Sequence, residues 1–261
     1  VDLTGKAPLI PFKDSVELVK KSIEVFDQLD PFFGDCLKTM DKLGYLDLES
    51  KEGKAPGGFN YPLYESGIPF IYMNAVGTFR DMVTMMHEGG HAIHSFLMAQ
   101  LELVDFQNTP SEVAELASMS MELMSMDHWD VFFENQEDLN RAKKEQLIGV
   151  LTTLPWVATI DEFQHWVYEN PTHSIDERTE NWNRINAKFS SPITDWTGWE
   201  EARNNTWQRQ LHLYEVPFYY IEYGMAQLGA IAVWRNYRTN PKKGLEQYQA
   251  ALKLGYTKSI G

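Results

Sequence analysis

The segment MMHEGGHAIHSFL, residues 85–97, places two histidines and a glutamate inside an apolar stretch with helical periodicity. His87 and His91 are four residues apart, so on a helix both imidazoles lie on one face, about 5–6 Å apart. Glu88 is rotated about 100° from His87, which sets its carboxylate beside that face. Buried imidazole and carboxylate groups are costly unless they are paired or bound to a metal. The segment therefore predicts a buried helix that presents His87 and His91 to one divalent cation.

These residues form an instance of H-E-x-x-H, a pattern typical of helices that bind zinc. In this pattern the glutamate is placed to take a proton from metal-bound water. Gly89 and Gly90 lie in the helix interior, where each costs roughly 1 kcal/mol relative to alanine. Glycines are typical of helix positions where another group approaches the backbone closely. The alternative is a helix with two half-buried histidines and an exposed glutamate.

A catalytic zinc needs a third protein ligand and one open position. The segment TPSEVAELASMSMEL, from residue 109 to residue 123, offers three glutamates. Glu112 lies three residues after a possible N-cap, Thr109, and is read as a capping acid. Glu115 lies on an apolar face without such a role, so it is the predicted ligand. Glu122 is either an acceptor for the outer nitrogen of a metal-bound histidine or a solvated glutamate at the core edge.

His94 is the rival third ligand, because it lies seven residues after His87 on the same face. Seven residues are about 10.5 Å of helix rise, which puts His94 out of reach of the same ion. A role behind the ligands or facing a substrate suits it better. His128, His165 and His173 lack ligand spacing and are read as structural.

The composition narrows the classes of partner. A net charge of −14 argues against binding of nucleic acid, which depends on clustered basic residues. No stretch of 18 apolar residues is present, so we expect a soluble protein that does not enter a membrane. A single cysteine, Cys36, excludes an internal disulfide and fits a reducing compartment, so we expect a cytoplasmic location. No signal peptide is visible at the N-terminus.

The remaining sequence reads as mainly helical, in one domain without repeats. Residues 14–46 predict two helices and residues 51–60 a Gly-rich loop, while IPFIYMN, residues 68–74, is the best strand candidate. The metal-binding helix is expected to begin near Thr78, whose spacing to Asp81 is typical of a capping box. Further helices are expected over residues 110–134, 137–168, 177–189, 198–213, 217–238 and 242–254.

Four segments resemble the thimet oligopeptidase and oligoendopeptidase F family of zinc metallopeptidases. They are HEGGHAIHS (87–95), AELAS (114–118), HLYEVPFYYIEYG (212–224) and GKAPGGFNYPLYESGIPFIYMN (53–74). The resemblance implies a helical zincin-like catalytic domain with a small β-sheet element before the zinc-binding helix, and one Zn²⁺ per chain. It also implies that residues 1–261 are the catalytic portion of a longer enzyme, without its N-terminal lobe and extreme C-terminal segment.

The resemblance further implies roles for the late aromatic segment. His212, Tyr220 and Tyr223 match the family's histidine and paired tyrosines, whose N–H and O–H groups can stabilise an oxyanion. If the alignment shifts by one residue, Tyr219 and Tyr214 take these places. Without the resemblance, an aromatic core stripe is the favoured reading of this segment.

Together these features predict a zinc-dependent oligoendopeptidase that acts on short peptides, with Glu88 as general base. By analogy, the strand at residues 68–74 offers an unpaired edge to the substrate backbone, and Gly57 and Gly58 let a peptide pass closely. Two alternatives stay open. One is a zinc exopeptidase of similar chemistry, and the other is a non-catalytic helical module that binds peptides.

Overall fold

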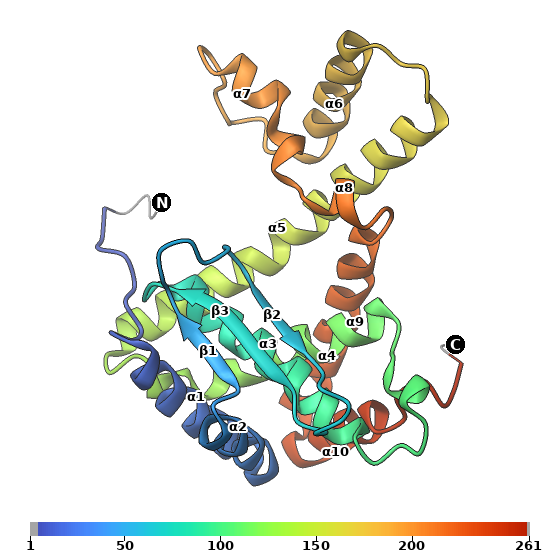
Figure 1. Ribbon diagram of the computed structural model, residues 1–261. Helices are drawn as coiled ribbons and strands as arrows, with labels where there is room; N and C mark the ends of the chain where they lie inside the picture. The colour runs from blue at the N-terminus through green and yellow to red at the C-terminus, as the bar shows by residue number, and fades with distance from the viewer. Residues whose placement is uncertain (1–4, 260–261) are drawn as a thin grey trace. The chain divides into compact units, whose positions relative to one another are not determined.

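The computed structural model describes residues 5–259 of the chain (Figure 1). The described residues divide into two compact units. The first comprises the described parts of Val1–Glu145 and Leu228–Gly261, and the second is Gln146–Gln227. Both consist mostly of helices, and residues 5–259 contain one small sheet, which confirms the predicted fold class. Within the described residues, no helix combines the length and apolar character needed to cross a membrane.

The helices occur in the predicted order along the chain. Before the boundary at Gln146 lie α1 (Ser15–Leu29), α2 (Pro31–Leu43), α3 (Phe79–Met98) and α4 (Ser111–Ser125), with the 3-10 helices η1 (Val104–Gln107) and η2 (Met126–Val131). Helices α5 (Gln136–Glu169) and α9 (Tyr220–Thr239) contain the unit boundaries. Between them lie α6 (Ile175–Phe189), α7 (Glu200–Asn204), η3 (Thr206–Arg209) and α8 (His212–Glu215), and α10 (Pro241–Leu252) follows α9.

The sheet has three strands, β1 (Leu46–Glu49), β2 (Gly58–Tyr61) and β3 (Phe70–Ala75), in the order β1-β3-β2. Strand β3 pairs with β1 in parallel and with β2 antiparallel. The predicted strand therefore exists, but the expectation that it offers an unpaired edge is wrong, because β3 is central. The predicted loop at residues 51–60 is wrong in its last part, where β2 begins. Gly-Phe-Asn-Tyr carries no strong strand signal by itself, and its pairing with β3 gives it the extended conformation.

Two helix starts test the predicted capping. The capping box at α3 is confirmed, because the Asp81 amide donates to the Thr78 hydroxyl and the Asp81 carboxylate accepts from the Thr78 amide. The predicted cap of α4 is wrong. Pro110, not Thr109, is the N-cap residue, and no side chain caps this end. The Pro110 carbonyl begins the helix by accepting from the amides of Val113 and Ala114.

Two predicted helices are interrupted. The helix expected over residues 110–134 ends at Ser125 and continues as η2. The helix expected over residues 198–213 divides into α7, η3 and α8. At this second break, the carbonyl of Arg203 accepts hydrogen bonds from the Trp182 indole and the Thr206 hydroxyl. These side-chain donors replace the backbone amide that would continue an α-helix.

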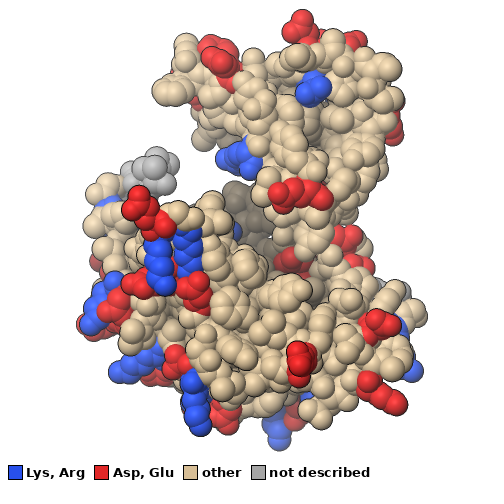
Figure 2. Space-filling model, viewed as in Figure 1, with Lys and Arg blue, Asp and Glu red and all other residues tan. Residues whose placement is uncertain are grey.

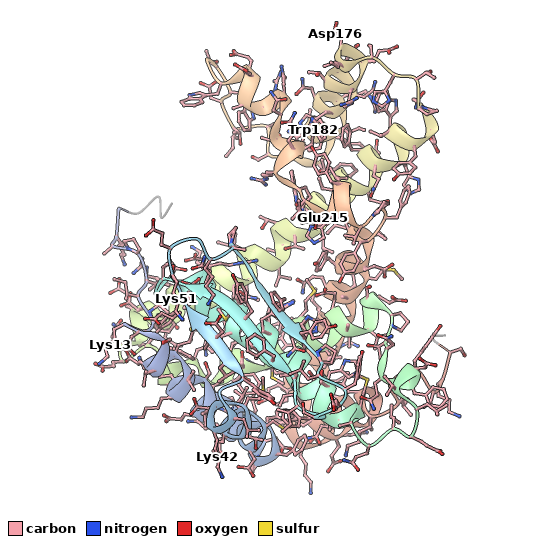
Figure 3. All side chains as sticks on the ribbon, viewed as in Figure 1. Lys13, Lys42, Lys51, Asp176, Trp182 and Glu215 are labelled. Atoms are coloured by element: carbon pink, nitrogen blue, oxygen red, sulfur yellow. The ribbon has the colours of Figure 1, made fainter. Side chains whose placement is uncertain are left out.

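Each unit has its own apolar core. In the first unit, α3 packs against α4 and against strands β2 and β3, and α1 packs against α2. The largest fully buried side chains there are Phe26, Phe33, Leu18, Leu37, Met40, Ile71, Met73, Met82, Met85 and Trp129. In the second unit, Ile160 and Phe163 of α5 pack with Trp182 and Ile185 of α6. Trp182, labelled in Figure 3, is fully buried.

The surface reflects the acidic composition. On the face drawn in Figure 2, the Lys and Arg side chains of the first unit lie among Asp and Glu side chains. The ion pairs of the first unit include Lys38 with Asp27 at 2.8 Å and Lys21 with Glu17 at 3.0 Å. The basic groups of this face are therefore not gathered into a continuous patch of the kind that binds phosphate backbones.

Candidate metal centre

Two helices bring three potential metal ligands together. His87 and His91 of α3 and Glu115 of α4 place one ligand atom each so that all three lie within 4.8 Å of one another. The Glu115 Oε2 atom is 3.3 Å from His87 Nε2 and 3.8 Å from His91 Nε2. Two imidazole nitrogens and one carboxylate oxygen suit the chemistry of a catalytic zinc, which keeps a fourth position for water or substrate. The donor set and its spacing therefore fit a zinc ion.

Gly90 explains how the two helices come so close. A Cβ atom at this position would lie 2.6 Å from the Cα atom of Ser118 and 3.1 Å from the carbonyl oxygen of Ala117, both on α4. Gly90 adjoins His91, and Ala117 lies two residues after Glu115. The absence of a side chain thus allows α3 and α4 to cross where the three potential ligands converge. The predicted close approach at Gly89 and Gly90 is confirmed, because a Cβ atom added at Gly89 would likewise lie only 2.5 Å from the Phe26 ring.

We expect Gly90→Ala to lower the free energy of unfolding by about 1–3 kcal/mol, because the added methyl group must push apart two backbones. Gly149→Ala is the matched control. Gly149 also lies within a helix, but a Cβ atom there would meet nothing within 4 Å, so we expect a gain of about 0.5–1 kcal/mol. Thermal and denaturant unfolding of both variants measures the difference. Unchanged stability of the Gly90 variant would show that the helices can separate without cost.

Glu122 forms a hydrogen bond with His87. Its Oε1 atom is 2.7 Å from His87 Nδ1, across the α3–α4 contact. With its proton on Nδ1, the His87 ring donates to this carboxylate and directs Nε2 towards Glu115 and His91. Burial lowers the pKa of His87, but hydrogen bonds to Glu115 and Glu122 outweigh it and hold the pKa well above its ordinary value. Burial lowers the pKa of His91 to about 3.

Glu88 is buried beside these ligands, with 5% of its surface exposed. Burial raises its pKa to about 7, against the opposing effect of His87. The backbone amide of Asn60 in β2 donates to the Glu88 carboxylate. A Cβ atom on Gly58 would lie 3.4 Å from Glu88 Oε1 and 2.8 Å from Thr84 Cγ2. Gly58 therefore lets β2 pack closely against α3 at Glu88, and the passage of a peptide along Gly57 and Gly58 stays a prediction.

In the second unit, the structure brings His212 together with three tyrosines. The His212 Nε2 atom lies 3.1 Å from the Tyr223 hydroxyl. The His212 ring centroid is 5.8 Å from that of Tyr219 and 5.2 Å from that of Tyr220. Tyr214 instead stacks on Trp207, with ring centroids 6.0 Å apart. Tyr219, Tyr220 and Tyr223 thus lie around His212. The Tyr214 ring packs on Trp207 instead.

Comparison with known proteins extends over nearly the whole chain. The sequence profile of peptidase family M3 matches residues 17–260. This chain belongs to peptidase family M3. The family resemblance predicted from the four sequence segments is thereby confirmed.

Individual M3 relatives agree with this assignment. An oligoendopeptidase F homolog of Borreliella burgdorferi is 26% identical over 256 residues, which are 95% of this chain and 42% of the relative. The solved structure of PZ peptidase A with an inhibitor matches with a TM-score of 0.89 and 33% identity, over 95% of this chain and 44% of that one. A putative oligoendopeptidase F from Bacillus anthracis matches with a TM-score of 0.81 and 30% identity, over 95% and 41%. This M3 chain therefore spans less than half the length of these relatives.

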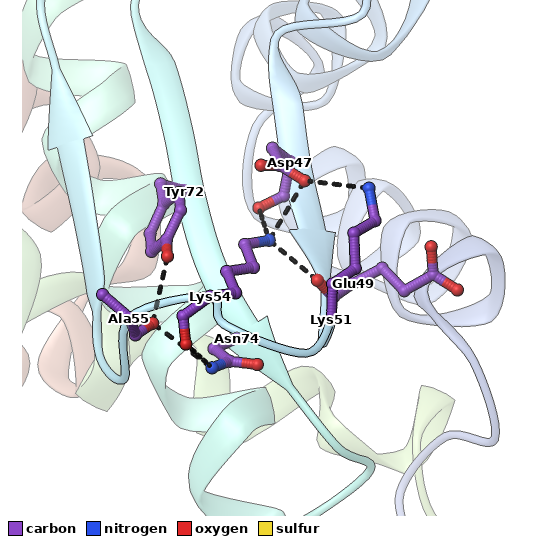
Figure 4. Close-up of polar contacts among 7 residues, drawn as sticks. All are labelled: Asp47, Glu49, Lys51, Lys54, Ala55, Tyr72 and Asn74. Carbon is purple, nitrogen blue, oxygen red and sulfur yellow. Dashed lines mark hydrogen bonds and ion pairs between the residues drawn. The ribbon is translucent and has the colours of Figure 1, made fainter.

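Lys54 fixes the loop of this M3 chain that leads to β2 (Figure 4). Its side chain is only 7% exposed, and Nζ donates to the Asp47 carboxylate at 3.0 Å and to the Glu49 carbonyl at 2.7 Å. The Nζ atom also lies 4.6 Å from the Tyr72 ring centroid. The Asn74 amide donates to the Lys54 carbonyl at 3.0 Å. These contacts tie the loop to β1 and β3 immediately before it turns at Gly57, which has a φ of +104°.

His94 is buried in the M3 chain, with 2% of its surface exposed and a hydrogen bond to the backbone of Leu252 in α10. Burial lowers its pKa to about 4. A ring in this place is not accessible to a substrate. The other histidines have protein partners: His128 lies 3.0 Å from Gln28 Oε1, and His173 accepts from Arg178 Nε at 2.8 Å.

Three residues that shape these sites could not be identified from the sequence. Lys54 looked like any lysine of a charged loop, and nothing in its neighbours predicted burial. Phe218 has a φ of +60°, in the left-handed region that side chains rarely adopt, and its amide donates to Gln164 Oε1 at 2.9 Å. Gln210 contacts His212, and the short separation of the two residues was the one available signal.

Proposed function

We propose that this M3 chain binds one zinc ion through His87, His91 and Glu115 and hydrolyses peptide bonds in short peptides. The observation that carries the proposal is the convergence of three ligand atoms within 4.8 Å from two helices. When bound, zinc would polarise the substrate carbonyl and lower the pKa of a water molecule to about 7. Two M3 relatives are named an oligoendopeptidase F homolog and a putative oligoendopeptidase F, and these names support the choice of peptide substrates.

Glu88 is the proposed general base. Glu88 follows His87 directly in the sequence, and its side chain is buried. The backbone amide of Asn60 orients its carboxylate. In this position it would take the proton of the attacking water and pass it to the leaving amine. Glu122 would keep His87 in the orientation that presents Nε2 to the metal.

His212, Tyr220 and Tyr223 are the proposed oxyanion donors, with Tyr219 as the neighbouring alternative. Attack on a peptide carbonyl builds negative charge on its oxygen, and preorganised N–H and O–H donors stabilise that charge. The support is the mutual packing of these rings and the contact between His212 and Tyr223. This cluster and the metal ligands belong to different units of the chain.

The proposal extends to the longer protein, its location and its substrates. The chain would be the catalytic portion of a longer metallopeptidase, located in the cytoplasm, with oligopeptides as substrates and no nucleic-acid partner. An exopeptidase of similar chemistry would need a free peptide terminus. A non-catalytic peptide-binding module would bind peptides without cleaving them.

The test uses the protein at its natural length and fluorogenic peptides blocked at both ends. We expect chelation to abolish cleavage and one equivalent of Zn²⁺ per chain to restore it, because the three ligands form one site. Cleavage of doubly blocked peptides identifies an endopeptidase, and cleavage of only unblocked peptides identifies an exopeptidase. Hydrolysis that persists at full rate after the metal is removed would refute the proposed function.

A further inference from the structure

Four side chains of the second unit form a continuous line of hydrogen bonds that ends at Tyr223. The Trp156 indole Nε1 lies 3.1 Å from Gln210 Oε1. The Gln210 Nε2 atom lies 2.6 Å from His212 Nδ1, and His212 Nε2 lies 3.1 Å from the Tyr223 hydroxyl. The line therefore joins α5, the end of η3, α8 and α9.

The first bond fixes the direction of the second. An indole N–H can only donate, so the Gln210 atom that faces Trp156 must be the carbonyl oxygen. The amide NH₂ of Gln210 then faces His212, and this group can also only donate. His212 Nδ1 must accept that bond with its lone pair. The proton of the neutral imidazole is consequently on Nε2.

The position of the His212 proton also sets the direction of the hydrogen bond to Tyr223. With its proton on Nε2, His212 donates to the Tyr223 oxygen, so the tyrosine's own proton is directed away from His212. A hydroxyl that accepts one hydrogen bond becomes a stronger donor in the next, because the bonds polarise one another. Tyr223 is thereby prepared to give its proton to a third group.

The start of the line is held firmly. The guanidinium carbon of Arg209 lies 4.5 Å from the Trp156 ring centroid, and the Trp182 ring meets Trp156 edge-on at 6.0 Å. The backbone amide of Gln210 donates to the Trp207 carbonyl at 3.0 Å. Both the indole donor and the Gln210 backbone are therefore fixed by contacts outside the line itself.

We propose that Gln210, oriented by Trp156, is a positioning residue that locks His212 in the Nε2–H tautomer and so makes the Tyr223 hydroxyl a donor towards the substrate. The part that concerns the substrate rests on the proposed function. The part that concerns the tautomer is a property of the resting protein.

Gln210→Glu is the decisive variant, because it keeps the shape of the side chain and replaces the donor by an acceptor. The carboxylate still accepts from Trp156, but it now also accepts from His212, which requires a proton on Nδ1. In the neutral ring Nε2 then becomes the acceptor, and the Tyr223 proton turns back towards His212. Gln208→Glu is the matched control, since Gln208 is exposed, lies two residues earlier and bonds to Asn205 instead.

Nitrogen-15 NMR of the His212 ring reports the tautomer directly, without any need for activity. We expect a protonated Nε2 and an unprotonated Nδ1 in the natural protein and in the Gln208 variant, and a protonated Nδ1 in the Gln210 variant. A natural protein with its proton on Nδ1 would overturn the inference. Thermal unfolding establishes that both variants are folded.

Peptide hydrolysis tests the consequence, at a pH where the NMR spectra show a neutral His212 ring. We expect Gln210→Glu to lower kcat by about 10²-fold with little change in KM, as for the loss of one oxyanion donor. The effect should be absent in a Tyr223→Phe background, because it acts through that hydroxyl. An undiminished kcat with the changed tautomer would refute the positioning role. If the natural protein cleaves no peptide at all, the proposed function fails, and the NMR result alone decides the tautomer.

Discussion

Glu88→Gln is expected to lower kcat for peptide hydrolysis by about 10²–10⁴-fold, the usual contribution of a general base. The glutamine has the same shape and still accepts the hydrogen bond of the Asn60 amide through its carbonyl oxygen. It cannot take a proton from water. Steady-state kinetics with a doubly blocked peptide measures the loss, and elemental analysis measures the zinc content, which should stay at one ion per chain.

The matched control for this experiment is Glu112→Gln, which makes the same chemical change on the neighbouring helix. Glu112 lies in the first turn of α4 and is outside the cluster of potential ligands. We expect its kcat and zinc content to be unchanged. Full activity of the Glu88 variant would contradict the assignment of the base. Loss of zinc from that variant would show instead that Glu88 supports metal binding.

Glu115→Ala is expected to weaken zinc binding by more than about 10²-fold and to abolish hydrolysis, because two imidazoles alone remain on the metal. Outer partners of metal ligands typically contribute 10–100-fold to affinity, so a direct ligand should contribute more. Glu122→Gln tests whether an outer partner contributes less to zinc affinity than a direct ligand. It removes the carboxylate that accepts from His87 Nδ1 and should cost about 10–100-fold.

Competition with a chromogenic chelator measures these affinities without reference to activity. The expected order of loss is Glu115→Ala, then Glu122→Gln, with Glu112→Ala as the unaffected control on the same helix. A Glu115 variant that keeps stoichiometric, tightly bound zinc would remove Glu115 from the ligand set. Equal losses from the Glu112 and Glu115 variants would indicate disruption of α4 instead of loss of a ligand.

Two kinds of feature in this chain could be predicted from the sequence, and both are local. The spacing of His87 and His91 sets their relation on any helix, because one turn of helix relates residues four apart. The capping box at Thr78 is equally local, since both of its hydrogen bonds join residues three apart. Glu115 was preferred over Glu112 because of its apolar face and because of a cap at Thr109; the cap is wrong, but the structure groups Glu115 with the histidines.

Other features depended on contacts between distant segments. Strand β2 became a strand by pairing with β3, and β3 lost its expected open edge for the same reason. Lys54 is buried because carbonyl oxygens of β1 surround its ammonium group, which its own neighbours in the sequence do not reveal. The break between α7 and η3 follows from the Trp182 indole, 21 residues before the carbonyl that it occupies.

The sequence by itself determined a mainly helical chain with one helix that carries two potential metal ligands four residues apart, because helix periodicity and capping act within a few residues. Only the tertiary structure decided that Gly90 lets α4 bring Glu115 to the histidines, and that Trp156 orients Gln210 from 54 residues away. The physical reason is that donor direction, burial and close backbone approach belong to pairs of groups. Such pairs exist only after the chain has folded, and no property of either residue alone specifies them.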